Sequence, residues 1–124
     1  MAVKVVDSSA LAALSFQEPE AAQVRSMLTG HELHAPALLR FEMTNICLSK
    51  IKRHPARRNE LVDMHRNSLR IVIRQHIADQ DEVLSVAEQY KLTGYDTAFL
   101  WLAIKLNAEL VTLDTELIEA AQKI

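Results

Sequence analysis

The stretch Val3-Lys4-Val5-Val6-Asp7-Ser8-Ser9 sets a short β-branched run directly before a change of structure. The four residues before Asp7 are typical of a strand. Ser8 and Ser9 are good N-caps, and they introduce an Ala/Leu-rich helix over residues 10–14. Asp7 is therefore expected at the carboxyl end of a strand that leads straight into a helix.

The same alternation continues along the chain. Further strands are predicted at residues 32–35, 69–74 and 109–113, and further helices at 21–28, 36–52, 56–67, 79–92 and 96–104, with a short helix at the end. No hairpin turn joins two strands, so we expect a parallel sheet with helices on both faces, a three-layer α/β/α sandwich. The 124 residues fit one domain, residues 1–124.

Composition narrows the class of protein. Apolar residues make up 49% of the chain and charged residues 24%, which is ordinary for a soluble globular protein. Cys47 is the single cysteine and suits a reducing cytoplasm. The first apolar run is interrupted at Asp7, so no signal peptide is expected, and no stretch reaches the length of a membrane span. The sequence predicts a cytoplasmic protein without a membrane segment.

Acidic residues follow two of the predicted strands. In open parallel sheets, ligands bind beyond the carboxyl ends of the strands. Asp7 and Asp114 each stand at such an end, and Thr112 points to the same side of its strand as Asp114. Aspartate also favours turns at these positions, so position alone is modest support for a site.

Glu42 gives a more specific indication. Its helical neighbours Leu38, Leu39 and Ile46 are apolar, and Asn45 shares this face one turn further on. A carboxylate that faces a core is costly unless a cation meets it. The alternative is a buried glutamate that is hydrogen-bonded to the backbone.

Asp96 stands in the first turn of a helix whose residues 98–104 are all apolar. Such a helix is expected to be buried, which would bring Asp96 to the edge of the sheet near Asp7 and Asp114. The alternative is an acid that caps the helix or complements its dipole.

Four carboxylates in one place raise one another's pKa, and a divalent cation relieves this. Mg²⁺ or Mn²⁺ prefers oxygen ligands and can activate water for phosphodiester hydrolysis. Zinc is not expected, because Cys47 is alone and five histidines are scattered without ligand spacing: His31, His34, His54, His65 and His76.

Four segments, in order and over nearly the whole chain, resemble the motifs of PIN-domain nucleases, particularly the VapC-type toxins of bacterial and archaeal toxin–antitoxin pairs. They are residues 5–11, residues 35–39 with Glu42 and Asn45, residues 92–98 and residues 110–114. The resemblance implies a PIN-like α/β/α fold and a Mg²⁺- or Mn²⁺-dependent endoribonuclease. It also implies three partners: an RNA substrate, a cognate antitoxin and a second copy in a homodimer.

Residue roles also follow from the resemblance. The catalytic acids would be Asp7, Glu42, Asp96 and Asp114, with the metal held mainly by Asp7, Asp96 and Asp114. Glu42 would either bind the metal or orient water, and the supporting residues would be Ser9, Asn45 and Thr112.

Positive charge gathers between residues 50 and 74, where eight Lys and Arg face two acids, Glu60 and Asp63. Such a run is most often a solvated helix face. An RNA substrate shifts the interpretation towards contact with the phosphate backbone, although an acidic partner would suit it equally. The candidates are Lys50, Lys52, Arg53, Arg57 and Arg58.

Two other classes of α/β protein were weighed against the nuclease. A phosphoacceptor receiver module needs paired acids at the first strand and a lysine after the last strand, but the first such lysine is Lys123. A dehalogenase-like phosphatase needs a second aspartate two residues after Asp7, where Ser9 stands. Both patterns are incomplete in this chain.

Overall fold

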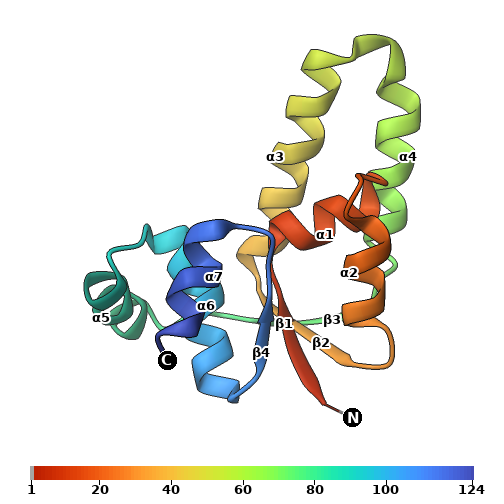
Figure 1. Ribbon diagram of the computed structural model, residues 1–124. Helices are drawn as coiled ribbons and strands as arrows, with labels where there is room; N and C mark the ends of the chain where they lie inside the picture. The colour runs from red at the N-terminus through yellow and green to blue at the C-terminus, as the bar shows by residue number, and fades with distance from the viewer. Residues whose placement is uncertain (1) are drawn as a thin grey trace.

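The computed structural model describes residues 2–124, and a parallel sheet of four strands forms its centre. The strands are β1 (Val3–Val6), β2 (Glu32–Pro36), β3 (Ile73–His76) and β4 (Glu109–Val111). They lie in the order β3-β2-β1-β4, and every neighbouring pair is parallel. The first strand of the chain therefore lies inside the sheet, beside the last one (Figure 1).

Helices cover both faces of this sheet (Figure 1). They are α1 (Ser8–Ser15), α2 (Ala21–Leu28), α3 (Leu38–Arg53), the 3-10 helix η1 (Pro55–Arg57), α4 (Arg58–Ser68), α5 (Gln80–Tyr90), α6 (Gly94–Leu106) and α7 (Thr115–Gln122). Val6 packs with the core residues of α1 to α4, whereas Val5 packs with Trp101 and Leu102 of α6. The predicted three-layer α/β/α sandwich with a parallel sheet is confirmed.

Helix α6 is apolar because it lies in the interior of the domain. Seven consecutive residues, 97–103, are buried between the sheet and the neighbouring helices α5 and α7. The apolar run thus serves the interior of the domain. Within residues 2–124, no helix combines the length and the apolar content that crossing a membrane requires.

Helices α3 and α4 form an antiparallel hairpin that projects beyond the rest of the molecule (Figure 1). Cys47 and Leu61 are buried between the two helices. The base of the hairpin is fixed by Arg40, whose guanidinium donates hydrogen bonds to the carbonyl oxygens of Ser68 and Ile71, each at 3.2 Å. The hairpin is therefore anchored at its base, while its far end projects from the rest of the molecule.

The third strand differs from its prediction. Residues 69–74 were expected to form it, but β3 begins at Ile73. The chain after α4 keeps turning, because the N–H groups of Leu69, Arg70 and Ile71 bond to carbonyls three residues earlier. The local β-branched composition is overridden by these turn hydrogen bonds, and the strand shifts towards His76.

Candidate active site

Asp7 is the most deeply buried of the four acids, with 3% of its surface exposed. Its Oδ1 accepts hydrogen bonds from the Ser9 hydroxyl at 2.8 Å and the Ala10 N–H at 3.0 Å, and its Oδ2 accepts one from the Thr112 hydroxyl at 2.5 Å. Asp7, not Ser8 or Ser9 as predicted, is therefore the N-cap of α1. Burial raises the pKa of Asp7 more than these hydrogen bonds lower it.

Hydroxyl groups join the ends of β1 and β4. Ser9 Oγ accepts the Leu113 N–H at 2.9 Å, and Thr112 Oγ1 accepts the Asp114 N–H at 3.0 Å. Asp114 in turn caps α7, because its Oδ1 accepts the Leu117 N–H at 3.2 Å. Ser9 and Thr112 thus lie at the acids, where the sequence predicted supporting hydroxyls.

Asp96 lies at the start of α6, but it does not cap that helix. Thr93 is the N-cap, and its Oγ1 accepts the Asp96 N–H at 3.2 Å. Asp96 is therefore not the N-cap, but it stands in the first turn of α6, so the alternative that it complements the helix dipole remains open. Burial and then the charge of Asp114 raise the pKa of its half-buried carboxyl, whereas a hydrogen bond with Thr93 lowers it.

Glu42 lies at the border of the α3 core face, next to buried Met43. Its Oε1 is fully buried and has no hydrogen-bond partner among residues 2–124, so the backbone-bonded alternative does not describe this oxygen. Burial raises the pKa of Glu42 first, followed by the charges of Asp96 and Asp7, while a hydrogen bond with Ser8 lowers it. This role of Ser8 was not predicted from the sequence, because a serine before a helix is a typical N-cap.

Each of the four acids is electrostatically coupled to two of the others, and we call this set the acid circuit: Asp7, Glu42, Asp96 and Asp114. Asp114 raises the pKa of Asp7 and of Asp96, and Asp96 and Asp7 both raise the pKa of Glu42. As the side chains stand, no three His, Cys, Asp or Glu residues within 2–124 are grouped closely enough to hold a metal ion. The structure therefore brings the predicted acids into one electrostatic unit at the carboxyl edge of the sheet, without drawing them into a tight cluster.

Comparison with known proteins identifies the family of the chain. Residues 4–123 match the PIN domain family. The chain belongs to the PIN-domain family. It is similar to Ribonuclease VapC3 of Pyrobaculum aerophilum, with 32% identity over 120 residues that cover 93% of this chain and 92% of the relative.

Two solved structures share the PIN fold. PAE2754 from Pyrobaculum aerophilum matches with a TM-score of 0.77 and 24% identity, over 98% of this chain and 81% of that one. The VapC20 toxin of Mycobacterium tuberculosis, described as cleaving the sarcin–ricin loop, matches with a TM-score of 0.66 and 14% identity, over 94% of each chain. At these identities the two structures support the fold alone.

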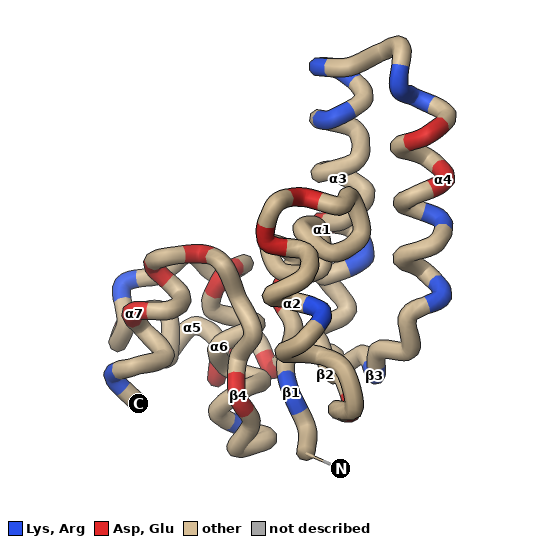
Figure 2. The backbone as a smooth tube through the Cα atoms, turned by 45° about the vertical axis from the view of Figure 1, so that its right-hand side comes forward, with Lys and Arg blue, Asp and Glu red and all other residues tan. Residues whose placement is uncertain are grey.

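The remaining predicted residues of this PIN domain lie on the α3–α4 hairpin. Asn45 is exposed on α3, so the expectation that it shares the apolar face with Glu42 is wrong. The basic candidates lie at the far end of the hairpin, on the last turn of α3, on η1 and at the start of α4 (Figure 2). They are Lys50, Lys52, Arg53, Arg57 and Arg58.

Two histidines that look unrelated in the sequence meet in the structure. His34 Nδ1 lies 2.7 Å from His76 Nε2, and His34 Nε2 lies 2.8 Å from Glu32 Oε1. Arg74 Nε extends this chain to the same carboxylate oxygen at 3.2 Å. The pair was not predicted from the sequence, because the predicted third strand ended before His76, whereas the observed register places both imidazoles on one face of the sheet.

Proposed function

We propose that this PIN domain is a Mg²⁺- or Mn²⁺-dependent endoribonuclease and the toxin of a toxin–antitoxin pair. The observation that carries the proposal is the proximity of four acids, in which the charge of Asp114 raises the pKa of Asp7 and Asp96 and the charges of Asp96 and Asp7 raise that of Glu42. The similarity to Ribonuclease VapC3 supports RNA as the substrate. Membership of the PIN-domain family favours a nuclease over the receiver-like signalling module.

The acids suit a hard divalent cation. The donor set consists of carboxylate oxygens, which Mg²⁺ and Mn²⁺ prefer. The buried Oε1 of Glu42 has no hydrogen-bond partner, and a nearby cation would compensate the cost of its burial. When bound, the ion would activate water and stabilise negative charge on the phosphate. We assign Asp7, Asp96 and Asp114 as the residues that would hold the ion.

The protein's own groups divide the work. Asp7 is held by three hydrogen bonds and supplies a fixed carboxylate around which the other acids arrange. Glu42 has a raised pKa, so it is suited to take a proton from the attacking water if it does not bind the ion itself. Ser9 and Thr112 orient Asp7 and do not react.

Partners and location complete the proposal. The toxin would be neutralised by a cognate antitoxin and would act in the cytoplasm, which suits the unpaired Cys47. A homodimer is supported by large apolar side chains around a cleft of about 560 Å³, among which Phe41 is 73% and Ile77 is 91% exposed. Light scattering on the purified protein tests the dimer, and a monomeric mass would contradict it.

Cleavage of a labelled RNA by the purified protein tests the activity. We expect cleavage with Mg²⁺ or Mn²⁺, none in excess EDTA, and none by Asp7→Asn under either condition. Asp63→Asn is the matched control, because Asp63 is an exposed aspartate on α4 outside the acid circuit. Undiminished cleavage in EDTA would exclude the metal, and equal activity of Asp7→Asn and Asp63→Asn would exclude the site.

A further inference from the structure

A small pocket where the α3–α4 hairpin packs against the end of α1 collects positively charged side chains. It has a volume of about 110 Å³ and is lined by Phe16, Lys50, Arg53, His54, Arg57 and Leu61. At roughly 30 Å³ per water molecule, it holds about three or four waters. This is the scale of one phosphate group.

Two of the cations in the pocket are held in place by carboxylates. Lys50 Nζ lies 2.7 Å from Glu18 Oε1 and 5.3 Å from the centre of the Phe16 ring. Arg57 makes two hydrogen bonds to Glu60, each at 3.1 Å. These contacts fix the walls of the pocket and neutralise part of their charge, so the remaining positive charge decides what the pocket attracts.

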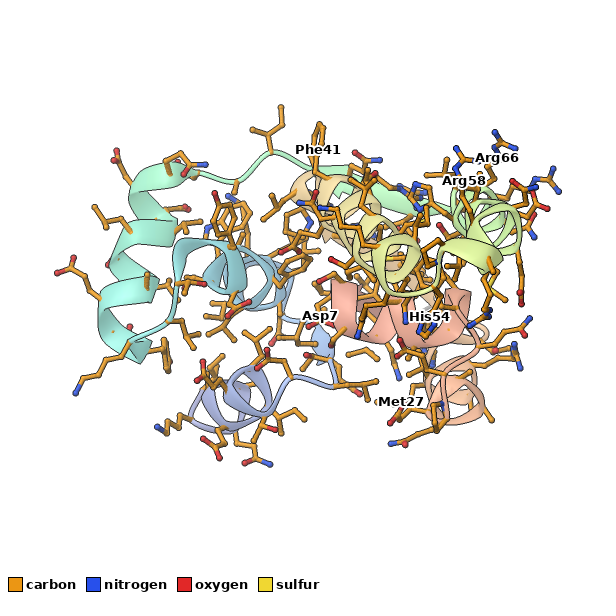
Figure 3. All side chains as sticks on the ribbon, turned by 90° about the horizontal axis from the view of Figure 1, so that it is seen from above. Asp7, Met27, Phe41, His54, Arg58 and Arg66 are labelled. Carbon is orange, nitrogen blue, oxygen red and sulfur yellow. The ribbon has the colours of Figure 1, made fainter. Side chains whose placement is uncertain are left out.

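Arg53 carries that remaining charge. Among residues 2–124, no carboxylate lies within salt-bridge distance of Arg53 or of its neighbours Lys52 and Arg58. Seen from above, His54 and Arg58 lie on the hairpin side of Asp7 (Figure 3). An anion entering the pocket would therefore meet, besides Lys50 and Arg57, the side chain of Arg53, which no carboxylate of the described residues neutralises.

The helix connects this pocket with the acids. Arg53 follows Glu42 by eleven residues on α3, which is about three turns, so both residues start from nearly the same face of the helix. At 1.5 Å per residue, they are about 16 Å apart along the axis. A stacked strand advances about 3.4 Å per nucleotide, so this span corresponds to about five nucleotides.

We propose that the pocket binds one backbone phosphate of the RNA substrate, about five nucleotides from the bond that is cut. The proposal rests on the ribonuclease function proposed above and adds a second point of contact with the substrate. A single phosphate fits the small volume and the free guanidinium of Arg53 better than a run of acidic side chains does. Arg53 is then a substrate-binding residue that does not take part in the chemistry.

Binding of RNA without cleavage tests the pocket. The probe is a fluorescein-labelled 12-nucleotide single-stranded RNA of mixed sequence, followed by fluorescence anisotropy in EDTA at several salt concentrations. Losing one phosphate contact lowers the salt slope by about 0.7, which corresponds to about fivefold weaker binding at 0.1 M salt. We expect this loss for Arg53→Ala and recovery for Arg53→Lys.

Arg66→Ala is the matched control. Arg66 lies on the same hairpin, is exposed, and stands 3.8 Å from Asp63, away from the pocket. Equal losses for the Arg53→Ala and Arg66→Ala variants would reduce the effect to general charge and overturn the proposal, as would no loss for Arg53→Ala. Unchanged RNA binding with Arg53-dependent binding of polyglutamate would overturn it in favour of an acidic protein segment.

Cleavage kinetics separate this inference from the proposed function. On a long RNA, Arg53→Ala should raise KM about fivefold and leave kcat unchanged, since one phosphate contact is lost. A substrate trimmed to three nucleotides on each side of the mapped cut should be cut equally by both proteins. RNA binding that depends on Arg53, without any cleavage, would contradict the proposed nuclease function and support the phosphate pocket. Cleavage that does not depend on Arg53 would support the nuclease function and contradict the phosphate pocket.

Discussion

The Thr112 hydroxyl donates a hydrogen bond to Asp7 Oδ2 at 2.5 Å, although 105 residues separate them in the sequence. The same hydroxyl oxygen accepts the Asp114 N–H at 3.0 Å. One side chain therefore sets the position of an acid after the first strand relative to an acid after the last strand. Fixed geometry of this kind is what a reacting centre requires.

Replacing Thr112 should slow catalysis without unfolding the protein. Thr112→Val removes a hydrogen bond to a charged group, worth about 1.5–3 kcal/mol. If that orientation acts mainly in the transition state, kcat for RNA cleavage should fall roughly ten- to hundredfold. Steady-state kinetics measure this, and Thr112→Ser should retain most of the activity. Full activity of Thr112→Val would show that Asp7 needs no help from β4.

Glu42→Gln should make the metal-free protein more stable at neutral pH. The buried Oε1 has no partner and burial raises the pKa of this carboxyl, so the charge of Glu42 costs stability in the folded state. We expect the melting temperature in EDTA to rise by about a few degrees and RNA cleavage to be lost. Glu60→Gln is the control, because exposed Glu60 is paired with Arg57 and its loss should not stabilise the protein. A lower melting temperature of Glu42→Gln would contradict the inference that the charge of Glu42 destabilises the folded protein.

The acid circuit also predicts a pH dependence. Asp7, Glu42 and Asp96 have pKa values raised above 3.8, 4.5 and 3.8, so the folded protein binds more protons than the unfolded chain. Their contribution to stability is complete below these values and is lost as the pH rises through the raised pKa values. The variant Asp7→Asn/Glu42→Gln/Asp96→Asn should therefore gain in melting temperature over the wild type as the pH rises from 4.5 to 7 in EDTA.

Mg²⁺ should raise the melting temperature of the wild type at pH 7 and so offset the advantage of the triple variant. A ligand at a hundred times its Kd stabilises a folded protein by about 2.7 kcal/mol. The shift in melting temperature with Mg²⁺ should appear in the wild type at pH 7 and be absent from the triple variant. An equal shift in both proteins would place the metal elsewhere.

The contribution of His76 to stability should change with pH in the opposite direction. Burial, followed by the charges of His34 and Lys105, lowers the pKa of His76 below 6.5, so the unfolded chain binds this proton more readily. Stability is therefore lost as the pH falls below 6.5 towards the lowered pKa. In His76→Gln this loss should be smaller, which melting curves between pH 7 and 5 would show against the wild type. A pKa of His76 at or above 6.5, measured by NMR titration, would contradict the prediction.

The sequence predicts the sheet well because its signals are local, since Val3 to Val6 are β-branched or flank such residues. The rule about ligand sites in parallel sheets also predicts that Asp7 and Asp114 lie at one edge. Asp7 directly follows β1, but β4 ends at Val111 and not at residue 113 as predicted, so Asp114 lies three residues beyond the strand as the N-cap of α7. Glu42 is found because its helix neighbours are apolar. Gathering all four acids into one site also depended on the resemblance to PIN-domain motifs.

What the sequence does not predict depends on hydrogen bonds between distant segments. Residues 69–71 look like a strand, but their N–H groups bond back to α4. The His34–His76 contact exists only in the register that this shift produces. Thr93, and not Asp96, caps α6, a choice between two plausible capping residues that propensity alone does not make.

The placement of β1 between β2 and β4 has a consequence for how the protein is made. During synthesis Asp7 leaves the ribosome well before Thr112, so β1 has to wait for its neighbour β4. At about 5–20 residues per second, the 105 positions from Asp7 to Thr112 take about 5–20 s to translate. The hydrogen bond that fixes Asp7 against the last strand therefore cannot form co-translationally until Thr112 has been made.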